Sequence, residues 1–216
     1  MRKSFIIAGT DTNVGKTVLS SLLMAANDDL YYWKPIQSGL DGETDSQVVR
    51  RLSECSAERI LPEGYRLQQP LSPHLSARLD GIHIEKEKLQ LPKEENMIVE
   101  TAGGVLTPIN EDTLQIDLIK MWSLPVIIAA RSSLGTINHS LLTIQALRNN
   151  GIEIAGVVMI GDINEENEKA VENYGSVHII GRIPFVKELN RRSLIEVYND
   201  WRTESPPHWN QVSQTT

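Results

Sequence analysis

The sequence predicts an α/β domain in which a mostly parallel sheet carries helices on both faces. Three observations lead to this prediction. Six short apolar runs alternate along the chain with stretches of helical pattern. The runs are almost continuously hydrophobic, which is typical of strands covered on both sides. The glycine-containing segment "GTDTNVGKT" follows the first run. Regular alternation of this kind favours parallel βαβ units with right-handed crossovers.

Strands and helices can be assigned in chain order from these patterns. We expect strands at 4–8, 30–33, 97–100, 125–129, 155–160 and 177–183, and helices at 17–26, 45–54, 113–122, 138–149, 165–174 and 191–198. The proline-rich stretch from 55 to 95 is expected to form loops with short helices. We expect residues 1–200 to form one domain, followed by a polar, proline-containing tail at 201–216.

Composition narrows the class of protein. The 216 residues are 40% hydrophobic and 23% charged, which is ordinary for a globular protein able to bury a core. The formal net charge of −7 argues against a nucleic-acid binder, which is more often basic. No segment approaches a membrane span in length, so no membrane association is expected. Cys55 is the only cysteine, which allows no internal disulfide and suits a reducing, cytoplasmic location.

The segment "GTDTNVGKT", residues 9–17, has the character of a phosphate-binding loop. Gly15, Lys16 and Thr17 lie between a predicted strand and a predicted helix, which is the context such a loop requires. Loop amides and the helix N-terminus surround phosphate oxygens, the lysine reaches the outer phosphates, and the threonine hydroxyl binds Mg²⁺. The loop has one residue more than usual before Gly15, so a chance Gly-Lys-Thr is the alternative. We predict a P-loop NTPase-type fold with nucleotide contacts from Asn13, Val14, Gly15, Lys16, Thr17 and Val18.

Three charged residues could complete this site. Glu100 ends the apolar run "MIVE", so its carboxylate is expected at the carboxyl edge of the sheet, where α/β proteins bind ligands. Asp45 begins a helix, and is either a second metal ligand or simply a capping residue. Lys34 ends the second strand at the same edge. It is either a solvated surface charge or a second cation beside a triphosphate.

Several stretches together resemble the dethiobiotin synthetase family: "GTDTNVGKT", "WKPIQSG", "SPHLSA", "VETAGG", "LPVIIAARSSLGTINHSLLT" and "GRIPF". The resemblance covers residues 4 to about 190, and the long loop resembles the variant of this family. It implies a homodimeric P-loop enzyme that uses MgATP to join CO₂ to 7,8-diaminononanoate, giving dethiobiotin, ADP and phosphate. In the family's mechanism, an amine captures CO₂ as a carbamate. The carbamate attacks the γ-phosphate to give a carbamic-phosphoric anhydride, and the second amine closes the ring.

The resemblance also implies roles for individual residues. Lys34 is similar to the catalytic lysine, Lys16 to the lysine that holds the phosphates, and Thr12 lies near the same chemistry. Ser38 is similar to a serine that contacts the substrate. The implied magnesium ligands are Thr17, Asp45 and Glu100. The substrate carboxylate is implied to bind the partner subunit's helix start, at Gly135, Thr136, Ile137 and Asn138, although Asn138 could also serve as a helix cap. The remaining implied nucleotide contacts are Thr101, Ala102, Gly103, Gly161, Asp162, Pro184, Phe185 and Val186.

The chain departs from the family pattern at three positions. Thr101 replaces a glycine beside the implied metal ligand, and would be strained if that position required a positive φ. Gly161 replaces an asparagine that reads the adenine, and Arg182 replaces a glutamate before Ile-Pro. Loss of the asparagine amide removes a group that both donates to and accepts from the base. We therefore expect weaker discrimination between ATP and other nucleoside triphosphates.

Three other functions fit the sequence less well. A partitioning-type switch ATPase carries a second lysine in its loop, at the position that Asp11 occupies here. A cobyrinate-type amidotransferase needs a glutaminase domain with a nucleophilic cysteine, and Cys55 lies in no such context. A silent ATP-binding module would not need Lys34, Ser38, Asp45 and Glu100 together. No chemical role is assigned to His74 or His139.

Overall fold

A seven-stranded parallel sheet forms the centre of the molecule. The computed structural model describes residues 4–204. The strand order is β4-β2-β6-β1-β7-β8-β9, and every described pair is parallel. The strands are β1 (Phe5–Gly9), β2 (Tyr31–Trp33), β4 (Ile60–Leu61), β6 (Met97–Gly104), β7 (Val126–Arg131), β8 (Ile154–Ile160) and β9 (Ile179–Ile183). All six predicted strands are therefore confirmed.

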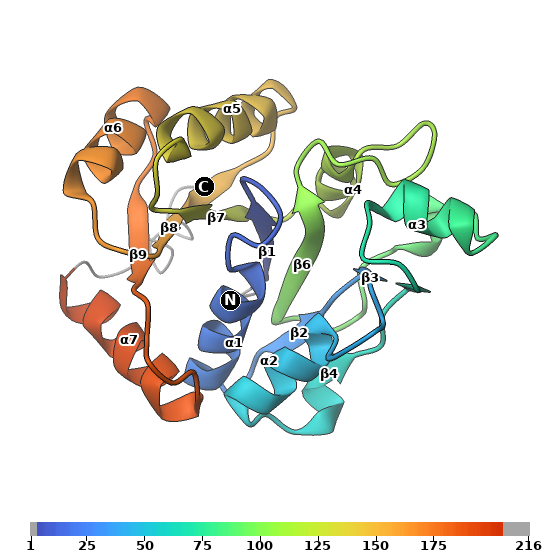
Figure 1. Cartoon of the computed structure of the whole chain (residues 1–216), viewed down its shortest axis with the longest axis horizontal. Coiled ribbons are helices and arrows are strands. Elements are labelled where there is room, and N and C mark those ends of the chain that lie inside the picture. Colours follow the sequence, from blue (N-terminus) through green and yellow to red (C-terminus); the bar gives the residue numbers. More distant parts are fainter. Residues whose placement is uncertain (1–3, 205–216) are drawn as a thin grey trace.

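Helices cover both faces of this sheet, as predicted (Figure 1). One face carries α1 (Lys16–Ala26), α2 (Asp45–Ser53) and α7 (Arg191–Glu204). The other face carries α4 (Gln115–Trp122), α5 (Thr136–Asn149) and α6 (Glu165–Gly175). Each layer buries its own apolar cluster against the sheet, one on the α1 side and one on the α5 side. Burial on both faces explains why the strand sequences are continuously apolar rather than alternating.

The order of the strands determines where a ligand can bind. β1 lies between β6 and β7. From β1 the chain first fills the side of the sheet that contains β2, β4 and β6, and then crosses to the side that contains β7, β8 and β9, so the order of the strands reverses at β1. In such sheets the crevice lies outside the carboxyl ends of the strands at this point. The loop after β1 runs into α1, and the segment after β2 runs toward α2. Both of these connections meet the carboxyl half of β6 at the crevice.

The stretch from 55 to 95 holds more regular structure than the sequence suggested. The expected loops with short helices are present, as α3 (Pro73–Leu79) and two 3₁₀ turns, Ala57–Arg59 and Lys86–Lys88. The short strand β4 and a separate two-stranded parallel sheet were not predicted. That small sheet pairs β3 (Ile36–Ser38) with β5 (Tyr65–Leu67). Strands of three residues with a polar centre give too short a pattern to be recognised.

The C-terminal helix is longer than predicted. α7 continues to Glu204 rather than ending at 198, so positions 201–204, which the sequence assigned to the tail, belong to a helix. Trp201 is buried against β9, and a Cβ placed on Gly181 would lie 2.5 Å from its ring. Its indole N–H donates to the Arg182 carbonyl. The rest of the predicted tail lies outside the described residues. Within residues 4–204, no helix is both long and apolar enough to cross a membrane.

Candidate active site

The loop between β1 and α1 has the backbone of a phosphate cradle. Asn13 and Gly15 have φ values of 57° and 102°, and Gly15 is the N-cap of α1. A Cβ on Gly15 would lie 2.8 Å from Ile160, so both the conformation and the space require glycine. Lys16 Nζ donates to the Asp11 carbonyl at 3.0 Å, across the mouth of its own loop. Burial and the nearby Lys34 lower the pKa of Lys16 to about 8.

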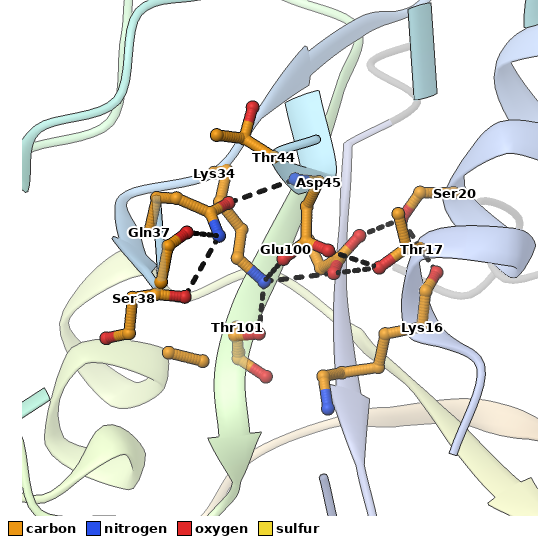
Figure 2. A network of polar contacts seen from close by, with 12 residues as sticks. Lys16, Thr17, Ser20, Lys34, Gln37, Ser38, Thr44, Asp45, Glu100 and Thr101 are labelled. Carbon is orange, nitrogen blue, oxygen red and sulfur yellow. Dashed lines mark hydrogen bonds and ion pairs between the residues drawn. The ribbon is translucent and has the colours of Figure 1, made fainter. Parts of the chain in front are cut away.

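The three predicted metal ligands converge beside this loop. Thr17 Oγ1 lies 2.9 Å from Asp45 Oδ1 and 3.0 Å from Glu100 Oε1 (Figure 2). One hydroxyl hydrogen cannot serve both carboxylates at once. Within residues 4–204, no three His, Cys, Asp or Glu side chains are grouped so that they could hold a metal ion by themselves. Two carboxylates and a hydroxyl nevertheless suit Mg²⁺, which binds nucleotides with a few protein oxygens and completes its shell with phosphate and water.

Lys34 is part of this cluster rather than a surface charge. Its Nζ lies 2.8 Å from Asp45 Oδ2 and 3.0 Å from Glu100 Oε1, and it donates to the Thr101 carbonyl at 3.1 Å (Figure 2). Burial alone would lower the pKa of Lys34, but the two carboxylates outweigh burial and raise it. Asp45 is not the helix cap, since Thr44 caps α2 in a capping box with Gln47. The alternatives of a solvated surface charge for Lys34 and a helix cap for Asp45 are therefore wrong.

Two further residues hold Glu100, and sequence reasoning missed both. Glu100 Oε2 accepts from Ser20 Oγ at 2.7 Å and from Tyr32 Oη at 3.1 Å. Ser20 follows Thr17 by three residues on α1. Tyr32 lies on β2 and precedes Lys34, just beyond the end of that strand, by two residues. Each pair therefore shares a face. Burial and the charge of Glu100 raise the pKa of Tyr32 well above its ordinary value, which keeps the phenol protonated. Helical and strand periodicity was the signal that could have identified them.

A cleft of about 870 Å³ opens in front of this cluster. Twelve of the predicted site residues line it: Thr12, Asn13, Gly15, Lys16, Thr17, Val18, Lys34, Ser38, Asp45, Glu100, Ala102 and Gly103. The Ser38 hydroxyl oxygen is buried and has no hydrogen-bond partner among the described residues. Glu100 does not end its strand, because β6 continues to Gly104, which pairs with Gly9.

Thr101 does not line the cleft and is not strained. It is 1% exposed within β6, and its φ is not positive. Its hydroxyl donates to the Ile7 carbonyl at 3.2 Å, while its own carbonyl accepts from Lys34. The position therefore requires no positive φ, and the Thr101 side chain stabilises the junction between β1 and β6.

A second pocket of about 680 Å³ adjoins the phosphate loop. The predicted base contacts Gly161, Asp162, Pro184, Phe185 and Val186 line it, together with Asn13, Val14, Gly15 and Val18 of the loop. Arg182 does not line it, because its guanidinium makes a two-pronged contact with the buried Glu168, at 2.7 Å for the closest pair. Arg131, which the sequence reasoning did not identify, lines this pocket and contacts Asp11 at 3.1 Å.

The predicted carboxylate-binding segment lies away from the 870 Å³ cleft. Gly135 is the N-cap of α5 with φ 93°, and no side chain caps the helix. The alternative that Asn138 caps it is therefore wrong. Gly135 and Asn138 are exposed, Ile137 is half-buried, and the Thr136 side chain is buried. None of these residues lines the 870 Å³ cleft of the same chain.

Comparisons with known proteins assign the chain to a family. A protein-family model described as an AAA domain matches residues 3–193. An ATP-dependent dethiobiotin synthetase BioD of Nitrobacter hamburgensis is 48% identical over 93% of this chain and 94% of its own. The corresponding protein of Agrobacterium fabrum is 47% identical over 92% and 93%.

Solved structures support the fold alone, because their sequence identity is low. A putative plasmid partition protein of Borrelia burgdorferi, bound to AMPPNP, has a TM-score of 0.59 at 14% identity and covers 98% of this chain and 100% of its own. The septum site-determining protein MinD of Pyrococcus horikoshii, complexed with Mg-ADP, has a TM-score of 0.53 at 12% identity and covers 99% and 97%. With its P-loop NTPase fold and its close sequence relatives, the chain belongs to the family of ATP-dependent dethiobiotin synthetases.

Proposed function

We propose that this protein is an ATP-dependent cyclo-ligase that forms dethiobiotin from 7,8-diaminononanoate and CO₂. One observation carries the proposal: the phosphate-loop residues Lys16 and Thr17 meet Asp45, Glu100 and Lys34 at one end of a cleft large enough for a small substrate. The chain has this arrangement together with 48% identity to a named synthetase over nearly its whole length.

The geometry suggests how the residues divide the work. The phosphate loop and Lys16 would hold the ATP phosphates, with Lys16 leaving the Asp11 carbonyl that it now contacts. Lys34 and Ser38 would face the carbamate formed from one amine and CO₂. The carbamate oxygen attacks the γ-phosphorus and ADP leaves, which gives a carbamic-phosphoric anhydride. The carbamate oxygen, a poor leaving group by itself, can then leave as part of phosphate. The second amine then attacks the carbonyl carbon and releases phosphate, which is favoured because both amines are held in one cleft.

We also propose that Thr17, Asp45 and Glu100 would hold Mg²⁺. The fit rests on the donor set: the Thr17 hydroxyl lies within 3.0 Å of both the Asp45 and the Glu100 carboxylate. Among the described residues, Lys34 supplies the only cation now in contact with both carboxylates. When bound, Mg²⁺ would neutralise charge on the β- and γ-phosphates. The protein would present one oxygen each from Thr17, Asp45 and Glu100, and the burial of Glu100 would limit the access of water to that side of the site.

The exposed, uncapped start of α5 offers backbone amides suited to a carboxylate, but it does not reach the cleft of its own chain. We therefore propose that the partner's α5 start completes the site. A symmetric dimer would then contain two equivalent shared sites.

Product analysis tests the proposed reaction. Purified protein is incubated with MgATP, diaminononanoate and carbon-13-labelled bicarbonate, and the products are separated by mass spectrometry. We expect dethiobiotin with one labelled carbon, in equal amount to ADP, and none with Lys34→Ala. ADP without labelled dethiobiotin would reject the proposal.

Subunit mixing tests the shared site. Lys34→Ala and Asn138→Asp, which sets a negative charge beside the substrate carboxylate, are each expected to be inactive. Mixed and refolded together, the two should regain about a quarter of wild-type activity, since half the dimers carry one intact site. No recovery, with heterodimers demonstrated, would place both residues in the same chain's site.

A further inference from the structure

The two oxygens of the Glu100 carboxylate have different surroundings. Oε1 faces the cleft cluster, where it contacts Thr17 Oγ1 and Lys34 Nζ, each at 3.0 Å. Oε2 faces the interior, where Ser20 and Tyr32 donate to it. The side chain is 0% exposed, and all four of its contacts are with protein groups. Each oxygen therefore accepts two contacts, and only Oε1 is available on the side of the phosphate loop.

The two hydroxyl groups on Oε2 are held by rigid elements. Tyr32 lies on β2, where its residue pairs with Ile98 on β6, two positions before Glu100 and on the same face. Ser20 lies on α1, one turn beyond Thr17, and its hydroxyl is closer to Glu100, at 2.7 Å, than to the Lys16 carbonyl, at 3.0 Å. Both residues are fully buried. A bond from a hydroxyl to a charged carboxylate is stronger than one to a neutral carbonyl.

We propose that Ser20 and Tyr32 are positioning residues that restrict Glu100 to binding a metal ion through Oε1 alone, and thereby make the site selective for Mg²⁺ over Ca²⁺. This inference rests on the proposed function, since it assumes that Thr17, Asp45 and Glu100 bind the metal ion of the nucleotide.

The selectivity follows from the different coordination numbers and metal–oxygen distances of the two ions. Mg²⁺ requires six oxygens at about 2.0–2.1 Å, whereas Ca²⁺ takes up to about eight at longer distances and readily binds both oxygens of one carboxylate. To give both oxygens to one ion, Glu100 would have to break its bonds to Ser20 and Tyr32. The Tyr32 hydroxyl would then be left buried without a partner among the described residues, which costs more than an ordinary hydrogen bond is worth. Ser20 would exchange a charged acceptor for the neutral Lys16 carbonyl at 3.0 Å.

A purely structural role predicts a different result. If the two hydroxyls only satisfied a buried carboxylate, their removal would lower stability and weaken both ions alike. The ratio of Mg²⁺ to Ca²⁺ affinity therefore separates positioning from simple satisfaction of hydrogen bonds. The thermal unfolding temperature does not separate them.

The experiment compares a double variant with a matched control. Ser20→Ala/Tyr32→Phe removes the two hydroxyls that contact Glu100. Ser21→Ala/Tyr31→Phe removes the same chemical groups from neighbouring positions, where Ser21 donates to the Thr17 carbonyl at 2.7 Å rather than to Glu100. The affinity for ADP is measured by calorimetry with MgCl₂ and with CaCl₂, on the full chain.

We expect the double variant to weaken binding of Mg-ADP by about tenfold or more and binding of Ca-ADP by clearly less. The control should keep the wild-type ratio. An unchanged ratio in the folded double variant would overturn the inference, as would wild-type ADP affinity that depends on neither ion. If the double variant does not fold, Tyr32→Phe and Ser20→Ala are measured singly, each with a smaller fall expected in the same direction.

The outcome can be separated from that of the proposed function. The titration uses no diamine and no CO₂, so a protein that made no dethiobiotin could still show the selectivity. Conversely, an unchanged ratio in a protein that makes labelled dethiobiotin would reject only the positioning role.

Discussion

Removal of the Lys34 ammonium should destabilise the protein as well as inactivate it. Its Nζ is the cation shared by Asp45 and the fully buried Glu100, at 2.8 and 3.0 Å. Removing one partner of a buried ion pair costs about 3–5 kcal/mol. The Asp45 side chain is 31% exposed and so keeps some water, and Glu100 retains hydroxyl donors. We therefore expect Lys34→Met to lower the free energy of unfolding by about 3 kcal/mol, near the lower limit.

Chemical and thermal unfolding test this expectation. In a chain of this size, a loss of about 3 kcal/mol corresponds to a fall of roughly 6–12 °C in Tm. Lys88→Met is the matched control: its ion pair with Glu85 is exposed, and such pairs contribute only about 0–1 kcal/mol. Adding Glu100→Gln to Lys34→Met should restore part of the loss, because the unpaired charge is removed. A loss below about 1 kcal/mol for Lys34→Met, or strictly additive effects of the two substitutions, would refute this reasoning.

Three further predictions follow from other parts of the structure. Trp201→Ala should lower the free energy of unfolding by about 3–5 kcal/mol in urea titrations, because the indole fills the space over Gly181; a change near zero would show that the end of α7 is dispensable. Arg182→Met should lower the free energy of unfolding by about 3–5 kcal/mol, because it leaves the buried Glu168 unpaired, and Arg182→Met/Glu168→Leu should lower it by much less. Neither variant should change the preference among nucleotides, and an altered preference would show that Arg182 contacts the base. The kcat/KM for GTP or CTP should lie less than about a thousandfold below that for ATP, since Gly161 offers no side chain to read the base; a larger ratio in steady-state assays would contradict this expectation.

The sheet was predictable because its strands are buried on both faces. Runs such as 97–100 and 125–129 are continuously apolar, and each is followed by a helical pattern. The end of α7 carried a usable signal as well. Leu194, Val197 and Trp201 recur at helical spacing and are all buried. The polar sequence that follows masked this signal and led to a tail being predicted at 201.

The arrangement of the site was predictable only where loops and strand ends carry distinctive residues. Lys16 and Thr17 follow from a motif, and Glu100 follows from an apolar run that ends in a carboxylate. Tyr32 and Ser20 look like ordinary core and helix residues. Periodicity places them on the same faces as Lys34 and Thr17, but it does not show that their hydroxyls meet one carboxylate. Such pairings across 68 and 80 residues depend on tertiary contacts that a single sequence does not display.

The central claim is that ATP cleavage is coupled to carboxylation of a diamine. Release of phosphate from MgATP tests it most directly, with diaminononanoate and bicarbonate each supplied or omitted. We predict release only when both are present, and its loss in Lys34→Ala. Release that is indifferent to both co-substrates, or no release from protein shown to bind ATP, would contradict the claim and favour a nucleotide switch or a regulatory module.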